Sequence, residues 1–178
     1  MRRLGLWLFV PLLVLAGCDK PAGDRAAKAV LPEGPTAKVD AVAGADLPAG
    51  VRDVALAKIP GMTIAEAERK ERDGMVFYDV EGTHPDGSEI ELDILEKDGA
   101  FTVVEVQRDI PWSAAPEPVR AAAEAAPDHF VPARVIESTQ NDGTVVYELF
   151  APGKTGEPAA EVNWKDGKAT LRSERNAY

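Results

Sequence analysis

Three acidic side chains alternate along one short stretch of the chain. Glu89, Glu91 and Asp93 are separated by Ile90 and Leu92, and alternating residues of a β-strand point to the same face. Carboxylate oxygens suit a hard cation such as calcium, so these three residues are candidate metal ligands. The surrounding sequence lacks the spacing of a calcium-binding loop, however, and a solvent-exposed acidic face opposite an apolar core explains the pattern better. We therefore expect no bound metal.

The amino-terminal residues contain a second candidate site, a single cysteine that follows a short apolar run. Arg2 and Arg3 precede an apolar run over residues 4–15, which is short for a bilayer span, because a spanning helix needs about 20 apolar residues. A basic start, a short apolar core and small residues before a cleavage point are typical of a secretory signal. We expect residues 1–17 to be a cleaved signal peptide, directly followed by Cys18, the only cysteine of the chain.

The sequence Leu-Ala-Gly-Cys at residues 15–18 resembles the lipobox of bacterial lipoproteins, in which the cysteine is lipidated and becomes the first mature residue. The resemblance implies a covalent lipid on Cys18, no other cofactor, and a lipid-anchored location at a cell-envelope membrane, facing the periplasm. Asp19 resembles the residue that retains some lipoproteins in the inner membrane, but the choice of membrane stays open. A plain secreted protein with one stray thiol is the alternative.

The charge of the chain limits its partners. The formal net charge is −10, and loss of the two arginines with the signal peptide makes it more negative still. Nucleic acids and anionic lipid headgroups are themselves negative, so the charge disfavours both as partners. Without a second cysteine, no disulfide can form within the chain, and the fold must depend on a hydrophobic core.

The chain divides into a tether and two related halves. Residues 18–46 are rich in Ala, Pro and Gly and lack aromatic residues, which predicts a lipidated flexible tether. Residues 47–110 and 111–178 then align with each other at an offset of about 70 residues, a period that indicates two copies of one supersecondary unit. The aligned pairs include Pro60 with Pro127, Asp73-Gly74 with Asp142-Gly143, Tyr78 with Tyr147, Glu91 with Glu161, and Lys97-Asp98-Gly99 with Lys165-Asp166-Gly167.

Each half opens with an alanine-rich helix and continues with strands. The helices are predicted over residues 47–59 and 116–126, where good helix formers end at a proline. Asp-Gly pairs between apolar runs predict hairpins. The predicted strands cover residues 63–72, 76–80, 89–94 and 100–104 in the first half, and 132–140, 144–150, 159–164 and 168–173 in the second.

A helix that ends at proline, followed by strands with a Val-x-Tyr-x-Val-like core and an Asp-Gly turn, is similar to the PepSY-like family, and its two-copy form to the beta-lactamase inhibitory protein. The motifs lie at residues 76–80, 90–94, 97–99, 145–149 and 165–167, with Val51, Pro60, Val119 and Pro127. The resemblance implies an α+β fold of two tandem units, each an N-terminal helix packed on a small antiparallel sheet of three to four strands. It also implies an extracytoplasmic binding or inhibitory module, sometimes associated with proteases.

No catalytic constellation is visible in the sequence. His84 and His129 are the only histidines, they occupy non-matching positions of the two halves, and no nucleophile or phosphate-binding motif accompanies them. Exposed aromatic residues often anchor protein interfaces, and Tyr78, Trp112 and Tyr147 are the candidates here. We therefore expect a non-enzymatic, membrane-anchored module that binds or inhibits an envelope protein such as a protease. The alternative is a cation-responsive envelope sensor that uses the acidic strand face.

Overall fold

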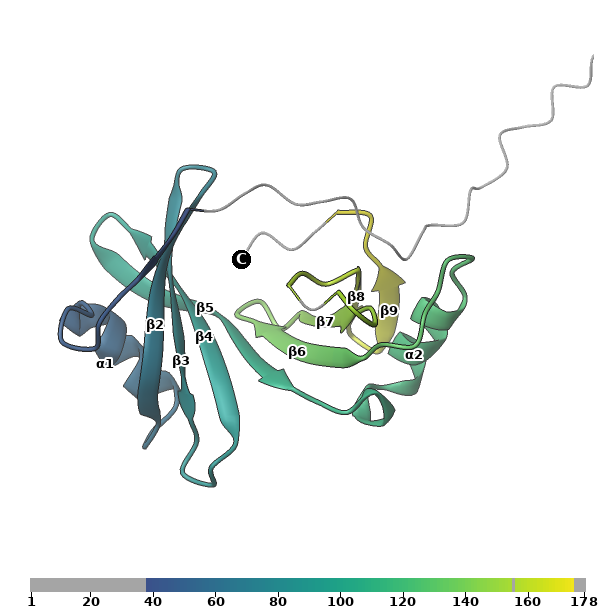
Figure 1. Ribbon diagram of the computed structural model, residues 1–178, viewed down its shortest axis with the longest axis horizontal. Coiled ribbons are helices and arrows are strands. Elements are labelled where there is room, and N and C mark those ends of the chain that lie inside the picture. The colour runs from purple at the N-terminus through teal and green to yellow at the C-terminus, as the bar shows by residue number, and fades with distance from the viewer. Residues whose placement is uncertain (1–37, 155, 175–178) are drawn as a thin grey trace, which may run out of the picture.

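The computed structural model describes residues 38–154 and 156–174 (Figure 1). Cys18, the expected signal peptide over residues 1–17 and most of the expected tether lie outside these residues. Within the described residues no helix combines the length and the apolar character needed to cross a bilayer. The elements are β1 (Lys38–Ala41), α1 (Ala49–Lys58), β2 (Thr63–Arg72), β3 (Met75–Thr83), β4 (Glu89–Lys97), β5 (Ala100–Asp109), a 3₁₀ turn (Trp112–Ala114), α2 (Glu117–Glu124), β6 (Arg134–Gln140), β7 (Val145–Phe150), β8 (Ala160–Lys165) and β9 (Lys168–Leu171).

All nine strands of the described residues form one antiparallel sheet in which spatial order follows chain order from β1 to β9. Short turns connect most of the neighbouring strands. Asp73, Asp98 and Asp166 have φ angles of 53°, 54° and 52°, and each precedes a glycine that also has a positive φ. Two successive left-handed residues make the turn type that matches the twist of a two-stranded hairpin, so the Asp-Gly pairs act as predicted.

The predicted α+β fold of two separate helix-plus-sheet units is wrong. The order of one helix and four strands does occur twice, but both runs belong to a single sheet, because β5 extends to Asp109 and pairs with β6. Side chains reinforce this junction. The Nε and Nη2 groups of Arg134 donate to the two carboxylate oxygens of Asp109 at 2.8 and 3.0 Å, and Arg108 forms an ion pair with Glu137 at 2.6 Å.

The fold also includes residues that were assigned to the tether. Lys38–Ala41 form β1, which pairs in antiparallel fashion with Glu68–Glu71 of β2. This strand lacks the alternating apolar residues of a buried strand, and its four residues are all exposed. Its pairing is therefore an edge contact made by the backbone, which a search for hydrophobic periodicity does not detect.

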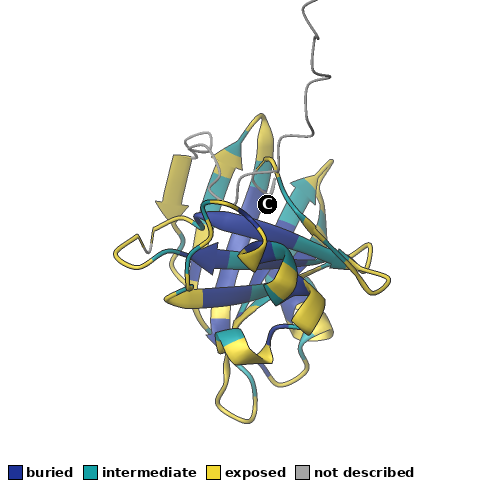
Figure 2. Ribbon diagram, turned by 90° about the vertical axis from the view of Figure 1, so that its right-hand side faces the viewer, coloured by how far each residue is buried: buried dark blue, intermediate teal, exposed yellow. Residues whose placement is uncertain are grey.

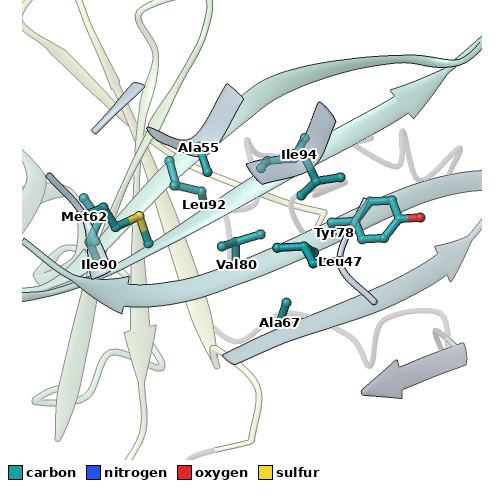
Figure 3. Packing of buried hydrophobic residues seen from close by; sticks show 10 residues of the cluster. Leu47, Ala55, Met62, Ala67, Tyr78, Val80, Ile90, Leu92 and Ile94 are labelled. Carbon is teal, nitrogen blue, oxygen red and sulfur yellow. The ribbon is translucent and has the colours of Figure 1, made fainter. Parts of the chain in front are cut away.

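Each helix covers one end of the sheet and closes a hydrophobic cluster. Val51 and Ala55 of α1 are fully buried and lie one helical turn apart, as do Val119 and Ala123 of α2. Figure 3 shows the cluster under α1, in which Leu92 and Ile94 of β4 pack with neighbouring residues. The corresponding cluster under α2 contains Val119, Ala123, Val135, Tyr147, Leu149, Ala160 and Val162.

The sheet bends at β5 and β6, so that its two ends turn toward each other and the helices lie on the outer sides (Figure 1). Figure 2 shows buried strand segments in the middle of the molecule and exposed residues on the outer surface of the helices. We call the sheet surface that faces away from both helices the inner face. Its buried apolar residues are Phe77, Val104, Ile136, Val146 and Phe150, which belong to neither of the two helix-covered clusters.

Candidate functional site: a buried carboxylate cluster

Strand alternation places acidic residues on the inner face. Tyr78 and Val80 of β3 belong to the cluster under α1, so Asp79 between them points to the opposite side. By the same alternation, Ile90 and Leu92 point to the helix, and Glu91 points inward. The face that the sequence predicted to be solvent-exposed is therefore turned into the space between the two ends of the sheet.

Asp79 and Asp93 form the centre of this cluster. They lie directly opposite each other on β3 and β4, and their exposed fractions are 6% and 0%. One oxygen of each carboxylate, Oδ1, is buried without a hydrogen-bond partner. Buried polar atoms are nearly always paired in folded proteins, and like charges directly opposite in a sheet are destabilising, so this arrangement is costly unless one carboxyl group keeps its proton or a cation joins the pair.

Glu91 completes a set of three. One carboxylate oxygen from each of Asp79, Glu91 and Asp93 can be chosen so that all three atoms lie within 4.8 Å of one another. We call these residues the carboxylate triad. Oxygens bound to one calcium ion at 2.3–2.6 Å are at most about 5 Å apart. The triad can therefore contact a single calcium-sized ion.

Two further side chains contact the triad. Lys70 of β2 places its Nζ 2.5 Å from Oδ2 of Asp79 and 4.0 Å from Oδ1 of Asp93. Gln107 of β5 donates from Nε2 to Oδ2 of Asp93 at 2.8 Å. Lys70 is a partner that can leave, because its side chain is 22% exposed. Gln107 fixes the orientation of the Asp93 carboxylate.

Three more acids approach the triad from β5 and from the other end of the sheet. Glu105 lies opposite Asp93 and accepts a hydrogen bond from the hydroxyl of Ser138. Glu148 lies opposite Glu161, which is 1% exposed and pairs with Arg172 at 3.2 Å. The second half thus repeats the cross-strand acid pair of the first half with glutamates.

The electrostatic consequence is that several of these acids hold their protons more tightly than usual. Burial raises the pKa of Asp79, and the neighbouring Asp93 raises it further, against the opposing effect of Lys70. Burial and the charge of Asp79 raise the pKa of Glu91 to about 7. Burial, followed by the charge of Asp93, also raises the pKa of Glu105. These acids therefore stay protonated at pH values at which a solvent-exposed carboxyl group has already released its proton.

An open cleft connects the triad with the surface. It has a volume of about 320 Å³ and lies between β3 and β4 on one side and the β5–β6 junction on the other. Glu66, Glu81 and Glu89 line one wall, Arg108 and Arg134 line the other, and Glu91 belongs both to the cleft and to the triad. A small cation entering the cleft would meet Glu91 before the buried aspartates.

The structure separates the three residues that the sequence proposed as metal ligands. Glu91 and Asp93 lie in the triad, whereas Glu89 is exposed at the end of β4 and lines the cleft. Asp79 was not among the ligands predicted from the sequence. Its strand contains Tyr78 and is followed directly by the strand of Asp93, so the pairing of the two aspartates could have been predicted. Glu105 could not be assigned to this face, because a β-bulge in β5 reverses the alternation between Val103 and Glu105.

The residues proposed for partner binding are mostly internal. Tyr78 and Tyr147 have exposed fractions of 6% and 2% and lie in the two helix-covered clusters. Trp112 is half-buried against the cluster under α2. His84 lies in the turn before β4, and Nδ1 of His129 lies 2.8 Å from the carbonyl oxygen of Ala126. In the described residues, neither histidine belongs to a group that could hold a metal ion.

Comparison with known proteins gives no relative for the chain. No protein-family model, no curated protein sequence and no solved structure matches it. The resemblance to the PepSY-like family therefore stays a prediction from short motifs.

Proposed function

We propose that this chain is a lipid-anchored envelope protein that binds a divalent cation, of the size of calcium, in its carboxylate triad. The observation that carries the proposal is the pair of buried Oδ1 atoms of Asp79 and Asp93, which have no hydrogen-bond partner. A cation bound between them would satisfy both atoms and offset the repulsion of the opposed carboxylates.

The donor set supports a hard cation. All three members of the triad offer carboxylate oxygens, and calcium takes six to eight oxygen ligands from carboxylates, carbonyls and water. The cleft beside Glu91 admits the water molecules that would complete the coordination shell. Soft metals prefer thiolate or imidazole ligands, which the triad lacks.

Ion binding would change the stability of the inner face. Glu91 lies near Asp79 and Arg134, and Glu148 of the other sheet end lies near both Glu91 and Lys70, close enough for their charges to interact. Neutralising the triad would weaken repulsion across the bend of the sheet. The protein would thus respond to the cation by holding its two sheet ends together more firmly, which is the physical basis for a cation-responsive module.

Calorimetric titration tests the proposal. The full-length chain, purified in detergent, is titrated with calcium, magnesium, manganese and zinc chloride. We expect one calcium site with a dissociation constant of about 0.1 to 1 mM, as in extracellular calcium modules, and a higher melting temperature with calcium. Absence of both heat and a melting shift at about 10 mM calcium, well above that range, would refute the proposal.

The envelope-protein partner expected from the sequence, for example a protease, remains a separate prediction. Because Tyr78 and Tyr147 are buried, a partner would have to contact other residues. The absence of enzymatic activity is likewise an expectation that rests on the sequence motifs.

A further inference from the structure

We propose that Lys70 is a tethered internal cation that occupies the place of the divalent ion and must be displaced when that ion binds. The inference rests on the proposed function, because it concerns the regulation of the same triad. Lys70 faces the three carboxylates that were identified as ligands: it is paired with Asp79, lies 4.0 Å from Asp93, and interacts electrostatically with Glu91.

A lysine ammonium fills this place incompletely. It carries a single charge on one nitrogen, and it is within hydrogen-bond distance of one oxygen, Oδ2 of Asp79. The two Oδ1 atoms of Asp79 and Asp93 stay without a hydrogen bond. A divalent ion brings twice the charge and can contact three oxygens at once, so it can replace the ammonium with a net gain.

The position of Lys70 allows the side chain to leave. β2 lies next to the edge strand β1, and the Lys70 side chain is 22% exposed. Glu68 lies two residues earlier on the same strand, so it shares the same face, and it is exposed. A displaced Lys70 can therefore turn toward water and toward the Glu68 carboxylate through rotations of its own flexible stem, without movement of the backbone.

Displacement explains which ions the site would accept. A sodium or potassium ion has the same charge as the ammonium and lacks its covalent tether, so it gains nothing by replacing Lys70. A divalent ion overcomes the tether through its additional charge. Lys70 would thus lower the affinity for every cation and exclude monovalent ones.

Two substitutions with opposite expected effects test the inference. Lys70→Met keeps the length and the apolar stem but removes the competing charge, so calcium should bind at least about 10-fold more tightly. Lys70→Arg places a guanidinium that can hold two carboxylates in a bidentate manner, so calcium should bind at least about 10-fold more weakly. Lys58→Met, on the exposed end of α1, is the matched control and should leave the affinity unchanged.

A measurement on the unmodified protein complements the variants. An amine-acylating reagent, with mass spectrometry of the peptides, reports the reactivity of each lysine. Saturating calcium should increase the acylation of Lys70 several-fold and leave that of Lys58 unchanged. This result does not depend on the folding of any variant.

The outcomes separate the two proposals. If the unmodified chain binds calcium but Lys70 reactivity does not change and Lys70→Met binds no tighter, the displacement is refuted while the cation site stands. If neither the unmodified chain nor Lys70→Met binds calcium, the cation site itself is refuted, and the displacement with it.

Discussion

Asp79 on β3 and Asp93 on β4 are directly opposed across the sheet, both are buried, and each has one carboxylate oxygen without a hydrogen-bond partner. Such a pair is unfavourable when both carboxyl groups are ionised, because two like charges are then held together away from water. The pair lies on the inner face next to Glu91, which also lines the cleft, and this arrangement supports the proposed cation site.

Removal of one ligand should abolish the response to calcium. Asp93→Asn keeps the shape of the side chain but removes its charge, and calcium affinity depends strongly on the number of charged ligands. We expect the dissociation constant to rise by about 10-fold or more and the calcium-dependent melting shift to disappear. Glu89→Gln is the matched control, because Glu89 lies on the same face of β4 but outside the triad. An equal loss in both variants would show that calcium is attracted only by general surface charge.

The stability of the metal-free protein should decrease as the pH rises. Burial and the charge of Glu161 raise the pKa of Glu148 to about 7, Glu91 acts in the same direction, and Lys70 and Arg134 oppose it. Because the unfolded chain releases this proton near pH 4.3, the folded state binds more protons above that pH. The free energy of unfolding therefore falls with rising pH, from about pH 5, and levels off above about pH 8.

Glu148→Gln isolates this contribution. With EDTA present, we expect the variant to be more stable than the unmodified protein at pH 8 by about 1 to 3 kcal/mol, and the difference to vanish near pH 4. Urea unfolding at a series of pH values measures it. Glu124→Gln, on the exposed side of α2, should show no such pH-dependent gain. A gain at pH 8 that persists unchanged at pH 4 would contradict the explanation.

Local structure could be predicted from the sequence to a large extent. Both helices and the eight strands after Leu47 occur where alternation, proline and Asp-Gly pairs indicated, including residues 63–72, whose helix-forming composition argued for a helix. Within β2, Ala67 packs in the helix-covered cluster while Glu68 pairs opposite Asp79. Sheet pairing thus overrides the intrinsic helix propensity of this segment.

The arrangement of these elements could not be predicted in the same way. Periodicity shows which residues share a face, but it does not show whether that face meets water or another part of the sheet. The merging of the halves depends on the pairing of Glu105–Asp109 with β6, and the position of Glu105 depends on a bulge. The burial of Asp93 results from the bend of the sheet at β5 and β6. The residues that flank Asp93 in the sequence do not reveal it.

Removal of the predicted lipidation site should release the protein from membranes. Cys18→Ser removes the thiol that the lipobox resemblance assigns to acylation, and a firmly bound lipoprotein requires two or more acyl chains. We expect the variant to appear in the soluble fraction and to lose labelling by a radioactive fatty acid. Membrane association equal to that of the unmodified chain would refute the tether.

The two hydrophobic clusters should unfold together. Leu92→Ala opens a cavity under α1 and Leu149→Ala opens one under α2, and each change should cost about 2 to 5 kcal/mol. Because β5 and β6 join both ends in one hydrogen-bonded sheet, scanning calorimetry should show a single transition that both variants shift to lower temperature. Two separate transitions, each shifted by one variant alone, would show that the halves fold independently.

A close backbone contact between β2 and β3 should make Gly82 sensitive to substitution. A Cβ atom at Gly82 of β3 would lie 2.2 Å from the carbonyl oxygen of Thr63 and 2.8 Å from the terminal methyl of Met62. The carbonyl belongs to the backbone of β2, beside the bulge after Ile64, so it cannot move without shifting the strand. We expect Gly82→Ala to lower the unfolding free energy by about 1 to 3 kcal/mol. Gly44→Ala, where no atom lies within 4 Å of the added Cβ, is the control. Equal stability of the two variants in urea unfolding would show that β2 and β3 are less closely packed than described.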